Sequence, residues 1–334
     1  MEIDGKDREI LAALDLDGRT GANEMGKKTG IPKQVVRYRI KRMMKNGIIE
    51  GFYATVDYRK LGFSIYNVLL KTSPSSEEKE RQFSDFLSGQ KNAVYVIKLM
   101  GTWDYYVAVA VKNGSELNTF LENLKKRYAK SIIDYGILNA ITDYAFPIKY
   151  VYPGKFSHLL FADVMGENGR GSAPELDGKS LDVLKVLAAN PLASAKEVML
   201  GTKLSFGKIR SVTERIFSSG VITRIRPTIN LKKMGYLRFL VFMKFRPDSE
   251  KICGDFISMA KSNSSIVFIN RCIGQYDMIV DLNVKDTDAL RKALFDIYGV
   301  LGDFLSKADV IPVYEEIKTA AASTEGKPKE FPFD

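Results

Sequence analysis

The spacing of apolar residues in the first thirty positions predicts two short helices. Ile10, Leu11 and Leu14 recur at helical intervals after Asp4, whose side chain can cap the start of a helix. Residues 22–28 repeat the pattern over a shorter length and end before a Gly-Ile-Pro turn. Both helices have one apolar side, so we expect them to pack on a common core.

A third helix is predicted from about Lys33 to Lys45. Val36, Ile40 and Met43 lie at spacings of four and three residues, which places them on one buried stripe. Gly47 is well suited to end the helix. Two β-rich segments follow, at 48–56 and 57–62, and they fit a wing. The pattern of the first 62 residues therefore predicts a winged helix-turn-helix.

The residues after position 62 alternate between β-rich and amphipathic segments. The expected order is strand, helix, strand, strand, helix, strand, over residues 65–71, 75–87, 93–100, 105–111, 115–124 and 132–144. This order is that of a ferredoxin-like βαββαβ domain, whose helices cover one face of the sheet. We expect the other face to carry Val94, Val96 and Lys98 against Val107, Val109 and Val111. That face needs a second sheet, from the same chain or from another chain.

The chain repeats itself at a constant offset of 173 residues, from position 3 to position 176. Ile3-Asp4-Gly5-Lys6 corresponds to Leu176-Asp177-Gly178-Lys179, and Gly101-Thr102-Trp103-Asp104 corresponds to Gly274-Gln275-Tyr276-Asp277. A register kept over more than a hundred residues indicates a duplicated domain pair, with two copies of the same α+β unit. The predicted divisions are winged helix-turn-helix domains at 1–62 and 175–235, ferredoxin-like domains at 63–150 and 236–318, a linker at 151–174 and a disordered tail at 319–334.

Basic residues concentrate on the third helix of the first copy, which contains no acidic residue. In a helix-turn-helix, this helix enters the major groove of DNA, where Arg and Gln can read base edges and Lys can neutralise phosphates. After the buried stripe is subtracted, the predicted DNA-binding residues are Lys33, Gln34, Arg37, Tyr38, Lys41 and Lys45.

The equivalent helix of the second copy, at about 206–218, keeps Lys208 and Arg210 but also carries Glu214. Its wing adds four basic residues, Arg224, Arg226, Lys232 and Lys233. Two interpretations stay open for this copy: it contacts the DNA backbone without reading sequence, or it is a packing module. We favour retained DNA contact and include Lys208 and Arg210 in the predicted interface.

Composition supports an anionic partner. The 334 residues carry a formal net charge of +10, with a pI of about 9.3, which favours nucleic acid first and a membrane surface second. No apolar run approaches the roughly 18 residues of a membrane span. The N-terminal residues lack the apolar core of a secretory signal, so we expect a cytoplasmic protein.

Candidate catalytic chemistry is sparse. His158 is the single histidine, which argues against a histidine-rich metal centre, a Ser-His-Asp triad or a Cys-His pair. Cys253 and Cys272 have no metal-site spacing and are expected to be free thiols in a reducing compartment. We expect no catalytic site, no metal and no cofactor.

The order and spacing of these motifs resemble the Lrp/AsnC family of regulators. The resemblance rests on Ile3-Asp4, on the basic helix that leads to Gly47-Ile48-Ile49, and on Gly101–Tyr105, and it recurs in the second copy. It implies that the α/β domains mediate dimers and higher oligomers. It also implies an amino acid or related effector near the turns formed by Gly101, Thr102, Trp103 and Asp104 and by Gly274, Gln275, Tyr276 and Asp277. Each turn also has a purely structural interpretation, in which glycine makes the bend and aspartate caps backbone amides.

The chain departs from the resemblance by carrying two units and by the weaker charge of its second recognition helix. The sequence predicts a sequence-specific, double-stranded-DNA-binding transcriptional regulator, modulated by a small effector and forming a homo-oligomer. One alternative is a ligand-sensing or assembly protein of this fold without specific DNA binding. Another is an enzyme like the haem-pathway decarboxylases, which share the two-part architecture but use histidines near the sheet.

Overall fold

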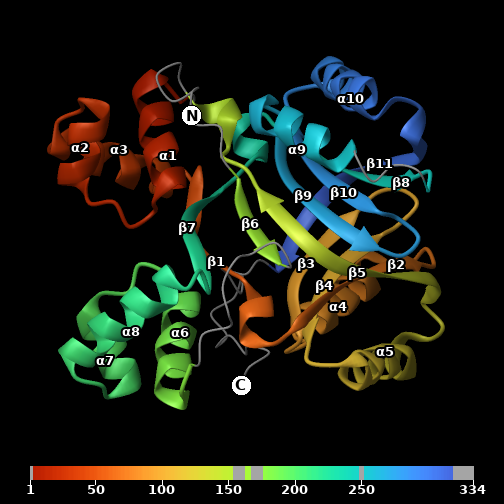
Figure 1. Ribbon diagram of the computed structural model, residues 1–334, viewed down its shortest axis with the longest axis horizontal. Helices are drawn as coiled ribbons and strands as arrows, with labels where there is room; N and C mark the ends of the chain where they lie inside the picture. The colour runs from red at the N-terminus through yellow and green to blue at the C-terminus, as the bar shows by residue number, and fades with distance from the viewer. Residues whose placement is uncertain (1–2, 153–161, 167–175, 248–251, 319–334) are drawn as a thin grey trace.

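The computed structural model describes residues 3–152, 162–166, 176–247 and 252–318 (Figure 1). The helices and strands of the first copy are α1 (Gly5–Leu16), α2 (Ala22–Thr29), α3 (Lys33–Lys45), β1 (Ile49–Val56), β2 (Ser64–Thr72), α4 (Glu77–Ser88), β3 (Ala93–Leu99), β4 (Tyr105–Val111), α5 (Gly114–Tyr128) and β5 (Ile132–Ala145). Short 3₁₀ helices follow β1 and β5, namely η1 (Tyr58–Leu61) and η2 (Lys149–Val151).

The second copy repeats this order. Its elements are α6 (Gly178–Ala189), α7 (Ala195–Thr202), α8 (Phe206–Ser218), β7 (Ile222–Ile229), η4 (Lys232–Met234), β8 (Leu237–Phe245), α9 (Ile252–Ser262), β9 (Ile266–Ile273), β10 (Met278–Val284), α10 (Thr287–Leu301), η5 (Gly302–Phe304) and β11 (Leu305–Lys318). Both ends of the three helix-turn-helix helices fall at the 173-residue offset found in the sequence. The duplication therefore preserves the length of these three helices as well as their order.

Local sequence explains where the first helices begin and end. The Asp4 carboxylate accepts from the Asp7 N–H, and the Asp7 carboxylate accepts from the Asp4 N–H, which closes a capping box at the start of α1. Gly30 adopts a left-handed backbone with φ of 75° and ends α2, a conformation that costs glycine little. The turn that follows sets the angle at which α3 leaves.

The strand after each recognition helix pairs with the other copy. β1 and β7 form an antiparallel two-stranded sheet in which Tyr53 lies opposite Arg226. The prediction of a second wing strand at 57–62 was wrong, because η1 occupies this segment. The Asp57 carboxylate accepts from the Arg59 N–H, and Gly62 with φ of 81° ends the turn. The two wings thus complete each other rather than forming two separate hairpins.

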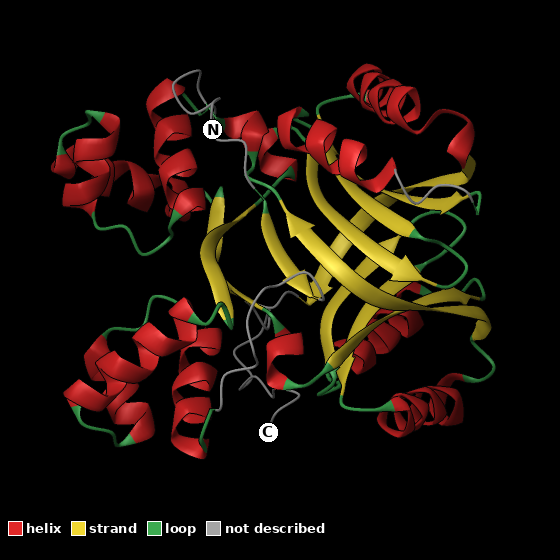
Figure 2. Ribbon diagram, in the orientation of Figure 1, coloured by secondary structure: helices red, strands yellow, loops and turns green. Residues whose placement is uncertain are grey.

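The remaining strands close into a barrel (Figure 2). Neighbours follow the order β2-β4-β3-β11-β8-β10-β9-β5, and β5 pairs back with β2. β5 and β11, at 14 residues each, are long enough to pair within their own copy and then with β9 and β3 of the other copy. The two ferredoxin-like sheets are therefore joined within one chain, and closure removes the sheet edges.

The predicted orientation of the first sheet was wrong. Val96, Val107 and Val109 pack under α4 and α5 in the cluster that contains Phe83 and Phe120. The opposite face, with Ile97, Leu99, Tyr106 and Ala108, belongs to the interior cluster shared by both copies. The sequence could not choose between the faces because all seven residues of β4 are buried.

Part of the predicted linker is ordered as a strand. β6 (Asp163–Gly166) pairs antiparallel with the end of β5. His158, most of the remaining linker and the predicted tail at 319–334 lie outside the described residues. Within the described ranges, no helix has both the length and the apolar character needed to cross a membrane.

Candidate nucleic-acid interface

α3 is held against α1 by apolar packing and by a buried carboxylate. Val36 and Met43 lie in one core with Ile10 and Met25, which confirms the predicted stripe; Ile40 is partly buried against the same core. The inner side of α3 is therefore fixed against the core, and its outer side consists of the residues that the core does not bury.

The ion pairs between α1 and α3 involve two of the basic residues of α3. The Arg39 and Arg42 guanidinium groups donate to the Asp7 carboxylate at 2.9 and 2.6 Å, and Asp7 has no exposed surface. Arg39 also pairs with Asp4 at 2.7 Å. The Asp7 N–H and the Arg39 guanidinium hold the pKa of the Asp4 carboxyl below its ordinary value. These two arginines stabilise the helix position, and neither belongs to the DNA-binding residues predicted from the sequence.

The other polar residues of α3 point to solvent. Lys33, Gln34, Arg37, Tyr38, Lys41 and Lys45 are all exposed. Among the described residues, no ion pair involves the four cations of this set. We call this set the α3 face. It combines side chains that can read bases with cations that can neutralise phosphates, free of competing carboxylates.

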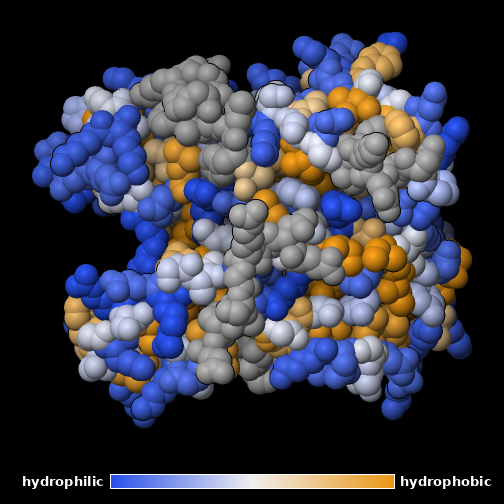
Figure 3. Space-filling model, in the orientation of Figure 1, coloured by the Kyte–Doolittle hydropathy of each residue, from blue (hydrophilic) through white to orange (hydrophobic). Residues whose placement is uncertain are grey.

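The second copy presents a different surface at the equivalent positions. Lys208 and Arg210 are exposed, but the Arg210 Nε lies 2.9 Å from the Glu214 carboxylate, at the position that corresponds to Lys41. Leu200 and Phe206, 71% and 63% exposed, replace Lys27 and Lys33. In Figure 3, the first three-helix unit is largely hydrophilic at its outer end, and apolar atoms appear at the outer edge of the α6–α8 unit. The duplicated surface has therefore lost most of its positive charge.

Two predicted basic wing residues are not available to DNA. Arg226 is 5% exposed and its Nε donates to Asp15 at 2.8 Å, while the Arg224 guanidinium makes a bidentate pair with Asp163 at 2.7 and 2.8 Å. Sequence reasoning could not find these pairs, because the partners lie 211 and 61 residues away. Lys232 and Lys233 remain exposed.

The predicted effector turns have structural roles in both copies. The Lys71 ammonium donates to the Gly101 carbonyl and Asp104 carboxylate at 2.8 and 3.0 Å, and the Thr72 N–H donates to Asp104 at 2.7 Å. The second copy repeats this arrangement with Lys244, Gly274, Asp277 and Phe245. Gly101, Thr102, Gly274 and Gln275 are exposed. A ligand at these turns stays a prediction.

Trp103 and Tyr276 meet across the two copies. Both are buried, and the Trp103 Nε1–H donates to the Tyr276 hydroxyl at 3.4 Å. The Tyr276 hydroxyl donates in turn to Asp309 at 2.5 Å, and burial raises the pKa of Tyr276. The structure thus brings one pair of the predicted effector residues together, inside the shared core.

Comparison with known proteins finds a matching family for the first three-helix unit. Residues 3–50 match the winged helix-turn-helix DNA-binding family. An uncharacterized HTH-type transcriptional regulator of Pyrococcus furiosus is 36% identical over 36% of this chain and 79% of its own length. The chain belongs to the HTH-type transcriptional regulators.

Two kinds of solved structure resemble this chain. An AsnC family transcriptional regulator from Agrobacterium tumefaciens is 25% identical, with a TM-score of 0.38, and covers 41% of this chain and 90% of its own. The siroheme decarboxylase NirDL is 13% identical, with a TM-score of 0.60, and covers 97% of this chain and 96% of its own. The second likeness shows that the tandem architecture is a known fold.

Proposed function

We propose that this chain is a sequence-specific transcriptional regulator that binds double-stranded DNA through the α3 face. The observation that carries the proposal is the exposure of Lys33, Arg37, Lys41 and Lys45 together, without an ion-pair partner among the described residues. A basic face of this kind attracts phosphates by releasing counterions, and Gln34 and Arg37 supply base-reading groups.

The support lies in the rigidity of the helix as well as in its charge. Asp7 fixes Arg39 and Arg42 against α1, so α3 presents its outer side without a change in its own packing. A preformed recognition helix loses little conformational freedom on binding, which favours affinity. The second copy would contribute less, because Arg210 is paired with Glu214.

The test is DNA binding by the full chain with Arg37 and Lys41 both changed to Glu. We expect affinity for its operator, selected from genomic fragments, to fall by at least about 100-fold, with a smaller dependence on salt, because each lost phosphate contact lowers the salt slope by about one. Sedimentation would show an unchanged assembly, since both side chains are exposed.

The matched control changes Lys125 and Lys126 on α5 to Glu, which gives the same change in net charge away from α3. This variant is expected to retain operator affinity within about threefold, since distant surface charges are screened beyond about 10 Å. Equal loss of affinity in both variants would reject the assignment to the α3 face.

An effector and homo-oligomer assembly belong to the same proposal. A methionine complex is described for a transcriptional regulator of Neisseria meningitidis, and the prediction of an amino-acid effector near the 101–104 and 274–277 turns rests on family resemblance. Titration of operator-bound protein with each amino acid, followed by sedimentation, tests both parts. Cytoplasmic localisation stays a prediction of the sequence.

A second candidate function, that of a siroheme decarboxylase, has one observation in its favour. The likeness to the siroheme decarboxylase NirDL extends over nearly the whole chain, and a structure of that protein contains an iron-uroporphyrin III analogue. Addition of the same analogue to this chain, followed by visible absorption spectra, distinguishes a decarboxylase from a regulator that does not bind tetrapyrroles. We expect no change in the tetrapyrrole bands.

A further inference from the structure

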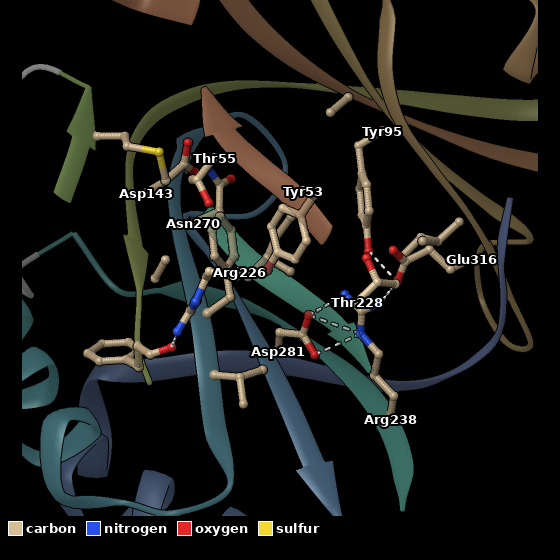
Figure 4. Close-up of a pocket in the computed structure, with 18 of the residues that line it drawn as sticks. Tyr53, Thr55, Tyr95, Asp143, Arg226, Thr228, Arg238, Asn270, Asp281 and Glu316 are labelled. Carbon is tan, nitrogen blue, oxygen red and sulfur yellow. Dashed lines mark hydrogen bonds and ion pairs between the residues drawn. The ribbon is translucent and has the colours of Figure 1, made fainter. Parts of the chain in front are cut away.

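A cavity of about 350 Å³ lies between the β1–β7 sheet and the barrel. Its wall includes residues of β1 and β7 on one side and strands from both ferredoxin-like sheets on the other. Figure 4 shows Tyr53, Thr55, Asn270 and Asp143 on one side, with Arg238, Asp281 and Glu316 gathered on the other. The volume is within the range of small-molecule sites in proteins.

Three buried polar atoms at this cavity have no hydrogen-bond partner among the residues that the structure describes. They are the Thr55 hydroxyl, the Thr228 hydroxyl and the Asn283 side-chain carbonyl oxygen. Asn283 is 6% exposed, and its amide nitrogen already donates to the Tyr150 hydroxyl at 3.2 Å. A buried polar atom without a partner costs about 1–3 kcal/mol, so three of them around one cavity indicate groups that an occupant satisfies.

The duplication shows that the cavity has diverged between its two halves. Thr55 and Thr228 are equivalent positions and both face the cavity. Arg238 and Asp281, joined by hydrogen bonds of 3.0 Å, occupy the positions of Ile65 and Ala108 in the first copy. The second copy is charged at these two positions where the first is apolar, whereas Asn67 and Asn270 lie where the other copy has Leu240 and Ile97. Each half of the cavity therefore has both polar and apolar groups, which suits a molecule with polar groups at both ends.

Each arginine of the lining is already paired, and the lining has one carboxylate in excess. Arg59 pairs with Asp143 at 2.8 Å, Arg226 with Asp15 at 2.8 Å, and Arg238 with Asp281 and Glu316 at 2.5 and 2.6 Å. An anionic ligand would have to compete with these carboxylates in a low-dielectric site and would meet the excess negative charge, and a cationic ligand would have to compete with these arginines. The lining therefore disfavours an anion most strongly, and a neutral occupant leaves the existing pairs intact.

We propose that this cavity binds a small, net-neutral organic molecule with hydrogen-bonding groups at both ends, one near Thr55 and the other near Thr228, and with an apolar body between them against Ile65 and Ala108. The molecule supplies a donor to the Asn283 oxygen and polar groups to the two hydroxyls. Burial raises the pKa of Tyr53 and of Tyr106, so both phenols at this cavity stay protonated. This site is separate from the α3 face and from the predicted effector turns, and its test does not depend on DNA binding.

The test measures thermal unfolding of the full chain with matched probes. Adenosine, thymidine, L-tryptophan and L-phenylalanine are net-neutral, while AMP, TMP, indole-3-acetate and phenylacetate are their respective anionic counterparts. We expect at least one net-neutral probe at saturation to raise Tm by about 3 °C, and its anionic counterpart to raise it much less. Dialysis with the stabilising probe is expected to give one bound molecule per chain.

Three isosteric variants locate the site. Thr55→Val and Thr228→Val remove a hydroxyl at the cavity, and Thr142→Val removes another buried unpartnered hydroxyl that does not line it. All three are expected to keep or raise Tm without probe, because each removes an unsatisfied group. Only the first two are expected to lose at least about tenfold in probe affinity.

Two results would overturn the proposal. One is the absence of any shift with the four net-neutral probes, which would leave the cavity to solvent only. The other is equal probe affinity in wild type and both cavity variants, which would place the bound molecule elsewhere.

Discussion

Asp7 lies on α1 without exposed surface and accepts hydrogen bonds from both Arg39 and Arg42 of α3. A buried carboxylate is stable only when it is paired, and here one carboxylate accepts from two arginines. The second copy has Ser180 and Arg215 at the equivalent positions of Asp7 and Arg42, joined by a single hydrogen bond of 3.2 Å. The strength of the α1–α3 contact therefore differs between the copies.

Replacing Asp7 with Ala is expected to lower the free energy of unfolding by about 3 kcal/mol, because the partly buried Arg39 and Arg42 lose their buried partner. Urea denaturation followed by circular dichroism measures this change. Ser180→Ala is the matched control and is expected to cost about 1 kcal/mol. Equal losses in the two variants would contradict the role given to Asp7.

Burial of the Lys149 ammonium gives the stability of the chain a measurable dependence on pH. The ammonium donates to the carbonyls of Ala260 and Lys261 at 2.7 and 3.1 Å, and burial lowers the pKa of Lys149 from 10.5 to about 8. Between about pH 8 and 10.5 the folded chain has lost this proton while the unfolded chain keeps it. The unfolded state then binds more protons, so this residue makes stability rise with pH over that range.

We expect wild type to gain stability relative to Lys149→Met when urea midpoints are measured at pH 7.5 and then at pH 9.5. Lys292→Met, at an exposed position on α10, provides the control and is expected to stay at a constant difference from wild type. A constant difference for Lys149→Met as well would show that the buried ammonium does not titrate in this range.

At the scale of elements, α3 and α8 have the same length and the same spacing of buried residues, but their exposed residues differ in charge and polarity. The buried positions Ile209, Val212 and Ile216 of α8 follow the predicted stripe, so helix formation does not depend on the outer residues. The outer positions of α8 have Glu214 and Phe206 where α3 has Lys41 and Lys33. Amphipathic packing fixed the helix, and the exposed side was free to change.

Glu214→Lys tests whether α8 lies near DNA in the complex. It frees Arg210 from its 2.9 Å ion pair and adds a cation, so we expect operator affinity at low salt to rise by about three- to tenfold, with a steeper salt dependence. Glu122→Lys on α5 gives the same charge change and is expected to have little effect. No difference between the two variants would indicate that α8 does not contact DNA.

At the scale of the whole molecule, the two copies share β1–β7, β3–β11 and β5–β9 pairings. Each ferredoxin-like sheet completes its barrel only with the other. Since neither copy can unfold without exposing the strand edges of its partner, we expect one cooperative transition for the described core.

Trp103 is the single tryptophan and belongs to the first copy, where it contacts Tyr276 of the second copy. Phe256→Ala removes a fully buried ring of α9 in the second copy and is expected to cost about 3–5 kcal/mol. The Trp103 fluorescence midpoint and the circular dichroism midpoint should shift together. Phe295→Ala, at an exposed phenylalanine, should leave both unchanged. A Trp103 transition that stays at the wild-type midpoint in Phe256→Ala would show that the copies unfold independently.

Much of the predicted site follows from local periodicity. The stripe of Val36, Ile40 and Met43 defined the outer side of α3 by subtraction, and all six of the predicted residues on that helix are exposed. The same reasoning failed for β4, where every residue is apolar and alternation carries no information. It also failed for Arg224 and Arg226, whose partners Asp163 and Asp15 lie far along the chain.

The sequence alone determined the three-helix units and the basic side of α3, because each depends on residues within a few turns of one another. It also determined the duplication, because the same residue types recur at a constant offset of 173 residues. The tertiary structure alone decided that β1 pairs with β7, that the sheets close into one barrel, and that Thr55, Thr228 and Asn283 surround one cavity. The edge of every strand offers the same N–H and C=O groups, so partner choice depends on how the whole chain closes rather than on any local pattern.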